Sequence, residues 1–166
     1  MALINKAWRE GEFVPAGAEP GLTVGSTWRE TVEIRAVAQI AQSRFAFPSA
    51  TEPDLNTSVN VPERQLGVRT AAGDLLFPDI VVMDTRTTAV QMVAEVETVR
   101  SLQESTDLVD KWRAFIGTGP FYLFVPTSEI NATRAKLRRA KLRLAGLRAW
   151  RHMAGMDYTD IVEVRV

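Results

Sequence analysis

Hydrophobic and polar positions along this chain follow first a helical and then a strand period. From Trp28 to about Gln42 apolar residues recur every three or four positions, which predicts a helix with one broad apolar face. Thr27 and Glu30 have the spacing of a capping box, in which a hydroxyl and a carboxylate bind the first free amides of the helix. Glycine and proline interrupt the preceding residues 1–26, which predicts a loop-rich N-terminal arm containing at most one short hairpin.

The middle of the chain carries strand patterns. Pro48, Pro53 and Pro62 lie among polar residues, so we predict a long loop from Phe47 to Glu63. Alternation with a period of two, interrupted by turn residues, then predicts three extended segments that form an antiparallel meander. These segments are 65–70, 75–83 and 90–97.

The last third of the chain has helical periods around one apolar strand. The pattern predicts a helix from about Gln103 to Ile116, and the apolar run from Phe121 to Val125 predicts a central strand buried on both faces. A basic helix is expected from Ser128 to about Ala145, followed by terminal strands at 147–150 and 161–166. This order of elements predicts a mixed α/β (α+β) fold in a single domain, 1–166.

Composition narrows the chemistry that this fold can carry. Among 166 residues there is no cysteine and one histidine, His152, which excludes thiolate metal sites, cysteine nucleophiles and two-histidine zinc sites. Carboxylates and lysine remain as the groups for catalysis. No apolar stretch approaches the roughly 18 residues of a membrane span and the first residues lack a signal-peptide layout, so we expect a cytoplasmic protein with no membrane partner.

Charge is distributed unevenly, although 20 Lys and Arg residues balance 20 Asp and Glu residues. After Pro126 there are nine basic and four acidic residues, and no acid lies between Asn131 and His152. A one-sided basic helix attracts a polyanion such as DNA. The alternative is a solvated helix whose cations suit the C-terminal end of its dipole. The candidate nucleic-acid contacts are Arg134, Arg138, Arg139 and Lys141.

Three carboxylates are predicted to gather at one end of a hairpin. Glu95 and Glu97 project to the same side of their strand, and a loop at 85–89 would place Asp79 opposite Glu95. Like charges about 4 Å apart repel by roughly 4 kcal/mol at an effective dielectric constant of about 20, so we expect a bound cation or a retained proton. Oxygen ligands favour Mg²⁺ or Mn²⁺, which can assist phosphodiester hydrolysis.

Pro78-Asp79 followed by Glu95-Val96-Glu97, within this order of elements, resembles the PD-(D/E)XK, or restriction-endonuclease-like, nuclease superfamily. The resemblance covers about residues 27–126. It implies a restriction-endonuclease-like core and binding of Mg²⁺ or Mn²⁺ by Asp79 and Glu95, with the backbone carbonyl of Val96 as a further ligand. It also implies DNA as the substrate and, by analogy with members that cut both strands, a homodimer.

The chain departs from the superfamily pattern at one position. The segment 93–126 also resembles uncharacterised bacterial members, but the motif normally ends in lysine and here it ends in Glu97. Some members move this lysine to the following helix, where Lys111 is the candidate because it lies at the edge of the buried face. Alternatively, Glu97 is a third metal ligand or a base, and Lys111 pairs with Asp107 on the surface.

Glu33 is a further acidic candidate. It lies between Val37 and Ile40 on the apolar face of the first helix, where an ionised carboxylate needs a partner. The resemblance implies a role here, because many superfamily members carry a glutamate on this helix that reaches the metal site. The alternative is an ion pair with Arg29.

Two functions follow from the sequence. The first is a metal-dependent nuclease that hydrolyses DNA phosphodiester bonds. Its candidate catalytic residues are Asp79, Glu95, Glu97, Lys111 and Glu33. The second is a catalytically inactive superfamily member that acts as a nucleic-acid-binding or protein-interaction module. A small-molecule site between the hairpin and the first helix is a third and weaker interpretation.

Overall fold

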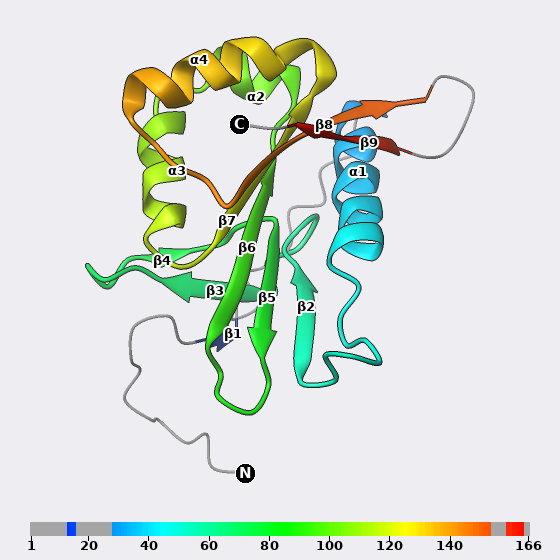
Figure 1. The fold of residues 1–166 in the computed structure, drawn as a ribbon, viewed down its shortest axis with the longest axis vertical. Helices are drawn as coiled ribbons and strands as arrows, with labels where there is room; N and C mark the ends of the chain where they lie inside the picture. Colours follow the sequence, from blue (N-terminus) through cyan, green and yellow to red (C-terminus); the bar gives the residue numbers. More distant parts are fainter. Residues whose placement is uncertain (1–12, 16–27, 154–158, 165–166) are drawn as a thin grey trace.

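A six-stranded sheet runs through the middle of the molecule, with helices on both of its faces (Figure 1). The computed structural model describes residues 13–15, 28–153 and 159–164. The strands, in spatial order, are β2 (Leu55–Val59), β5 (Ile80–Asp84), β6 (Val90–Val96), β7 (Phe121–Pro126), β8 (Gly146–His152) and β9 (Thr159–Val164). β7 is parallel to its neighbours β6 and β8, and the other adjacent pairs are antiparallel. The predicted mixed α/β class is confirmed.

A second, smaller sheet lies beside the first one. It consists of β3 (Leu66–Arg69) between β1 (Phe13–Pro15) and β4 (Leu75–Leu76), all antiparallel. The predicted meander is therefore wrong in one respect, because 75–83 forms two strands in two sheets. The break falls at Pro78, which has no N–H to donate to a sheet.

Four helices flank the main sheet in the described part of the chain: α1 (Trp28–Arg44), α2 (Val99–Glu104), α3 (Leu108–Ile116) and α4 (Ile130–Ala140). In Figure 1, α1 lies on one side of the sheet, and α3 and α4 lie on the other. A 3₁₀ turn, Thr127–Glu129, leads from β7 into α4. None of these helices is long and apolar enough to cross a membrane.

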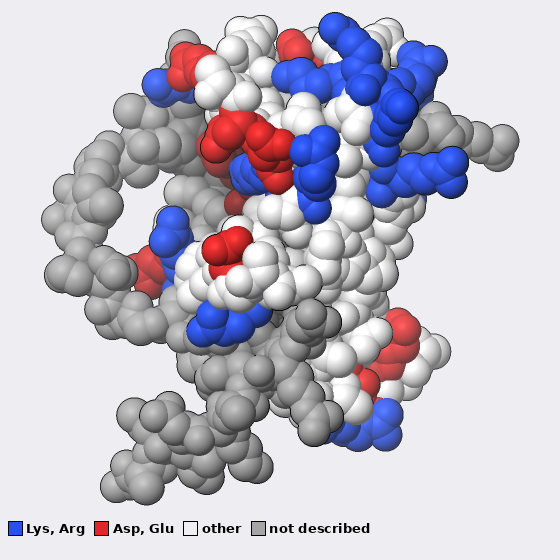
Figure 2. Space-filling model, turned by 90° about the vertical axis from the view of Figure 1, so that its left-hand side faces the viewer, with Lys and Arg blue, Asp and Glu red and all other residues white. Residues whose placement is uncertain are grey.

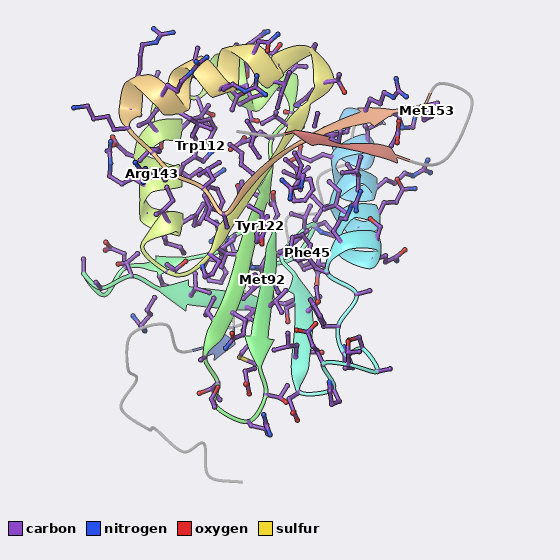
Figure 3. All side chains as sticks on the ribbon, viewed as in Figure 1. Phe45, Met92, Trp112, Tyr122, Arg143 and Met153 are labelled. Atoms are coloured by element: carbon purple, nitrogen blue, oxygen red, sulfur yellow. The ribbon has the colours of Figure 1, made fainter. Side chains whose placement is uncertain are left out.

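The sheet has an apolar core on each face because its strands alternate. Val81 of β5 packs on the side of α3 and α4, whereas its neighbours Ile80 and Val82 pack on the side of α1. Phe121, Leu123 and Val125 of β7 face α3 and α4, and Phe124 faces α1. Figure 3 shows Trp112 and Phe45 on these opposite sides. The prediction that the apolar run of β7 is buried on both faces is confirmed.

The predicted loop from Phe47 to Glu63 is wrong, because it contains strand β2. β2 pairs with β5 from Leu55↔Asp84 to Val59↔Ile80 and forms one edge of the main sheet. All five of its residues are partly buried, so an alternating burial pattern is missing. Because Asn56-Thr57-Ser58 is polar, this edge strand lacks the hydrophobic pattern from which a strand is predicted.

Two predicted helices also have different limits. The helix expected from Gln103 to Ile116 is two helices, since α2 starts after Thr98 and ends at Glu104 before α3 begins at Leu108. The basic helix ends at Ala140 rather than Ala145, because Lys141 adopts a left-handed conformation (φ 54°). The predicted capping box at Thr27 and most of the arm 1–26 lie outside the described residues.

Candidate functional site

The β5–β6 hairpin brings Asp79 and Glu95 together. Ile80 pairs with Ala94 and Val81 with Val93, and the same register continued by one residue places Asp79 opposite Glu95, as predicted. β5 ends at Asp84 and β6 begins at Val90, so the loop spans 85–89 as predicted, and a bulge at Val82/Met83 shifts the pairing only on the turn side of Val82. The register that matters for the carboxylates is the predicted one.

Hydrogen bonds to the backbone fix these two carboxylates. The amide of Val96 donates to Oδ2 of Asp79 (2.8 Å), and the amide of Asp79 donates to Oε2 of Glu95 (3.3 Å). The side chain of Val96 is buried on the α1 side of the sheet. Asp79 and Glu95 are therefore held across the hairpin by reciprocal contacts between side chain and backbone.

Asn60, which the sequence analysis did not identify, anchors the segment that carries Asp79. Its buried Nδ2 donates to the carbonyls of Leu66 and Pro78, each at 2.7 Å, and its Oδ1 accepts from the amides of Gln65 and Leu66, each at 2.7 Å. Its own amide donates to the carbonyl of Asp79 (2.9 Å). This one side chain links the two sheets at the carboxylates.

Lys111 of α3 reaches the carboxylates. Its ammonium forms an ion pair with Oε1 of Glu95 and lies 3.4 Å from Oε1 of Glu97. The lysine side chain is 37% exposed, whereas those of Glu95 and Glu97 are 6% and 2% exposed. The ammonium contacts these two carboxylates rather than Asp107, whose carbonyl accepts the backbone amide of Lys111 within the helix.

Glu97 is anchored more extensively than its neighbours. Ser101 Oγ donates to its Oε2 (2.5 Å), and Trp112 Nε1 donates to its Oε1 (3.0 Å). The indole of Trp150 donates to the backbone carbonyl of Glu97 (3.1 Å). The backbone amide of Glu97 donates to the carbonyl of Phe124 (2.8 Å). Glu97 thus connects β6 to α2, α3 and β8.

Burial dominates the electrostatics of the site. It raises the pKa of Asp79 to about 7 and that of Glu95 to about 8, against the opposing effects of the Val96 amide on Asp79 and of the Lys111 ammonium on both. Burial disfavours the charge of Lys111, but Glu95 and Glu97 hold its pKa above the ordinary value. Three carboxylates therefore meet one ammonium, and Asp79 and Glu95 together retain about one proton near neutral pH.

Glu33 of α1 also lies within electrostatic reach of this cluster. It is partly buried, and its negative charge raises the pKa of Asp79. The side chain of Arg29, its alternative partner, lies outside the described residues. The structure thus brings Asp79, Glu95, Glu97 and Lys111 into contact, with Glu33 nearby on another element.

The donor set suits a divalent cation only in part. Asp79 and Glu95 supply oxygen donors and surplus negative charge, which Mg²⁺ or Mn²⁺ would neutralise. Within the described ranges, however, no group of three or more acidic or histidine side chains is arranged to hold a metal ion. Glu97 directs its two oxygens to Ser101, Trp112 and Lys111. The residues fit a cation held by two carboxylates rather than three.

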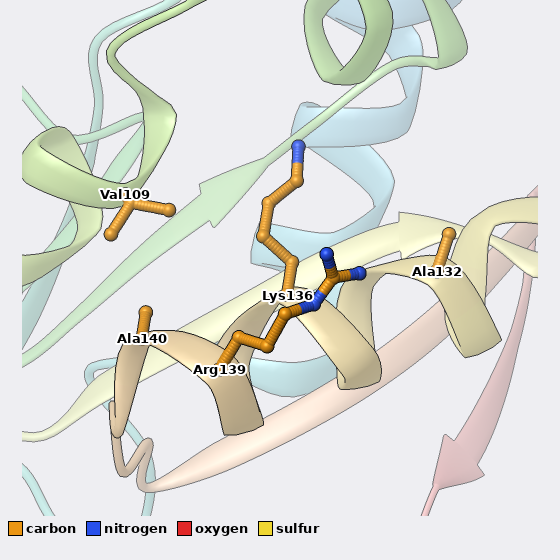
Figure 4. Close-up of a pocket in the computed structure, with 5 residues that line it drawn as sticks. All are labelled: Val109, Ala132, Lys136, Arg139 and Ala140. Carbon is orange, nitrogen blue, oxygen red and sulfur yellow. The ribbon is translucent and has the colours of Figure 1, made fainter.

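The basic residues around α4 form a surface distinct from the carboxylate site, and Figure 2 shows it at its upper right. Arg138, Arg139 and Lys141 are exposed, whereas Arg134 is partly buried. A groove of about 440 Å³ lies between α3 and α4. Its lining residues, drawn in Figure 4, are Val109, Ala132, Lys136, Arg139 and Ala140. Lys136, which the sequence analysis did not select, thus joins Arg139 at this groove.

The groove and the carboxylates lie on opposite flanks of α3. Leu108, Trp112 and Phe115 face the sheet. Val109 lines the groove with α4, whereas Lys111 contacts Glu95 on β6. Positions 109 and 111 differ by about 200° around a helix, at roughly 100° per residue. The basic surface therefore does not adjoin the carboxylate site directly.

A small depression on the other face of the sheet bears on the small-molecule interpretation. It is lined by residues from the end of α1 and from β6, β7 and β8, and holds about 140 Å³. Ligand pockets usually measure about 300–1,000 Å³. The depression is thus too small for an ordinary metabolite site.

Comparisons of the chain with protein-family models, with curated proteins and with solved structures found no match. The geometry described above is therefore the basis for the functional proposal.

Proposed function

We propose that this chain is a metal-dependent nuclease-like hydrolase of DNA phosphodiester bonds, with the restriction-endonuclease-like core that its motif and order of elements suggest. The observation that carries the proposal is the meeting of one buried carboxylate, one partly buried carboxylate and one ammonium from three elements. Asp79 precedes β5, Glu95 lies on β6 and Lys111 lies on α3. Clustered groups with perturbed pKa values are typical of functional sites.

Each residue has a distinct role in this proposal. A bound Mg²⁺ or Mn²⁺ would supply a reactive water and neutralise charge on the phosphate. Asp79 and Glu95 would hold the ion through carboxylate oxygens, and each oxygen has lone pairs beyond those used for the backbone amides. Lys111, which is partly exposed, would donate from Nζ to a phosphate oxygen or to the attacking water.

The reaction is an ordinary hydrolysis. The oxygen of water bonds to phosphorus, one phosphorus–oxygen ester bond breaks, and the leaving oxygen takes up a proton. One DNA fragment ends in a phosphate and the other in a hydroxyl. The surplus proton on Asp79 and Glu95 would leave when the cation binds, because the cation replaces it as the neutralising charge.

Plasmid cleavage tests this proposal directly. Wild-type protein should nick or linearise plasmid with Mg²⁺ or Mn²⁺ and not with EDTA. Asp79→Asn, Glu95→Gln and Lys111→Met should each lower the rate at least 100-fold. Asp74→Asn changes an exposed acid at a distant turn and should stay within twofold of wild type. Absent cleavage, or cleavage that survives Asp79→Asn, would refute the proposal.

An inactive relative that binds nucleic acid is the second candidate. The observation that favours it is the pairing of Lys111 with Glu95 and Glu97, which gives the ammonium partners within the chain itself. The exposed cations of α4 would then provide the contact with DNA. This candidate predicts binding that weakens steeply with salt and no metal-dependent cleavage.

A further inference from the structure

Glu97 occupies the position of the motif lysine, yet its surroundings are those of an anchor. Its side chain is 2% exposed, and three donors approach its carboxylate. Ser101 Oγ (2.5 Å) belongs to α2, whereas Trp112 Nε1 (3.0 Å) and Lys111 Nζ (3.4 Å) belong to α3. A buried carboxylate with this many donors is satisfied without a metal ion.

The two donors from α3 are consecutive residues that point in different directions. Trp112 is fully buried against the sheet, and Lys111 leaves the same helix about 100° away. Both meet the same oxygen of Glu97. Together these bonds fix the rotation of α3 about its axis and so the direction in which Lys111 extends.

Ser101 of α2 holds the other oxygen of the Glu97 carboxylate. It closes a capping box with Thr98 at the start of α2, which sets the path of the chain directly after Glu97. Its hydroxyl holds Oε2, which leaves Oε1 for Trp112 and Lys111. The carboxylate is thus oriented by α2 and in turn orients α3.

We propose that Glu97 is a positioning residue, neither a metal ligand nor a base, whose carboxylate, held by Ser101 and Trp112, sets the Lys111 ammonium against Glu95. This inference rests on the proposed function, because Lys111 is the group that would act on substrate. It explains how a chain with glutamate in the motif position still places an ammonium at the carboxylates.

Metal affinity distinguishes a positioning role of Glu97 from a role as a metal ligand. Mn²⁺ binding, followed by electron paramagnetic resonance, should change less than threefold in Glu97→Gln and fall at least tenfold in Asp79→Asn. A tenfold loss in Glu97→Gln would overturn the inference by making Glu97 a ligand.

Kinetics provide the second readout. Glu97→Gln and Trp112→Phe, which keeps an aromatic ring without the N–H donor, should lower kcat ten- to a hundredfold with KM for DNA unchanged within threefold. Ser101→Ala should act in the same direction and more weakly. The double variant Glu97→Gln/Lys111→Met should be no slower than Lys111→Met, since Glu97 acts through Lys111. If the losses in kcat of Glu97→Gln and Lys111→Met multiply in the double variant, Glu97 acts independently of Lys111 and the inference is overturned.

A third readout needs no activity and so separates the two proposals. In competitive acetylation followed by mass spectrometry, Glu97→Gln and Trp112→Phe should each raise the labelling rate of Lys111 at least fivefold relative to Lys141, which is exposed. An unchanged ratio would overturn the positioning role. Absent cleavage by wild type with a raised ratio would refute the nuclease proposal and leave the positioning role standing.

Discussion

The backbone amide of Asp79 donates to Oε2 of Glu95 at 3.3 Å, so that two carboxylates lie together in a buried part of the β5–β6 hairpin. Burial raises the pKa of both, with smaller contributions from the negative charges of Glu33 and Glu97 on Asp79 and of Asp79 and Glu97 on Glu95. The site is therefore a place where the folded protein holds a proton that the unfolded chain releases. A proton with this property makes stability depend on pH.

The sign of this pH dependence follows from the raised pKa values. In the unfolded chain both carboxyls ionise near pH 4, and in the folded protein they ionise near pH 7 and pH 8. Between these limits the folded state binds more protons, so stability should fall as pH rises. Each retained proton corresponds to about 1.4 kcal/mol per pH unit, and because both carboxyls retain theirs over most of this range, the loss between pH 5 and pH 7 is about 5 kcal/mol.

Urea unfolding at pH 5, 6 and 7 without divalent metal measures this slope. Asp79→Asn should flatten it, because the amide does not titrate and no longer repels Glu95. Asp74→Asn should leave the slope unchanged. A stability that rises over this pH range would contradict the assignment.

Divalent metal should replace the retained proton and stabilise the fold. At a Mn²⁺ concentration of about 100 times Kd, the expected gain is about 2.7 kcal/mol. For a chain of this size that corresponds to a rise in Tm of roughly 5–10 °C. Calorimetry at pH 7.5 should show this shift in wild type and not in Asp79→Asn or Glu95→Gln. Equal shifts in all three proteins would show that Mn²⁺ binds elsewhere.

Asn60 should be among the most sensitive polar positions of the chain. Asn60→Ala removes four side-chain hydrogen bonds, one to the carbonyl of Pro78 beside Asp79 and three to the backbone of Gln65 and Leu66, and leaves their partners unsatisfied. We expect a loss of about 2–4 kcal/mol in the free energy of unfolding, measured in urea. Asn131→Ala, at an exposed position of α4, should change stability by less than about 0.5 kcal/mol. Similar values for the two variants would contradict the role of Asn60.

The cations of α4 should govern the proposed binding to DNA, since Arg138 and Arg139 are exposed and the partly buried Lys136 lines the groove. Replacing Lys136, Arg138 and Arg139 together by Ala should weaken binding of a duplex, measured by fluorescence anisotropy, and lower the slope of log K against log salt by up to about three. Arg86→Ala, on the β5–β6 turn, is the matched control and should leave the slope unchanged. An equal effect of both changes would place the DNA contact elsewhere.

The sequence predicted the part of the site that depends on strand alternation and register. Glu95 and Glu97 share a face because residues two apart in a strand do so, and the hairpin register followed from turn residues. The helical wheel predicts Lys111 at the edge of the buried face, because its helix has a clear apolar stripe. These relations are local, so a single sequence carries them.

What the sequence did not predict depends on contacts between distant segments. β2 is an edge strand with polar residues, and its place is set by pairing with β5 rather than by its own pattern. Asn60 and Trp112 could not be assigned to the site because their partners are defined only in the folded chain. Ser101 left a local signal, the hydroxyl pair Thr98 and Ser101, which also marks the true start of α2.

The position of α3 between the groove and the carboxylates has a consequence for the length of substrate. The flanks of α3 that carry Val109 and Lys111 lie one helix diameter apart, roughly 10–12 Å. At about 3.4 Å per base pair this offset corresponds to about three base pairs. A dinucleotide could therefore reach the carboxylates without touching the cations of α4, whereas a longer duplex would engage both. Under the proposed nuclease function, substrate length alone would then distinguish DNA molecules that Asp79, Glu95 and Lys111 themselves treat alike.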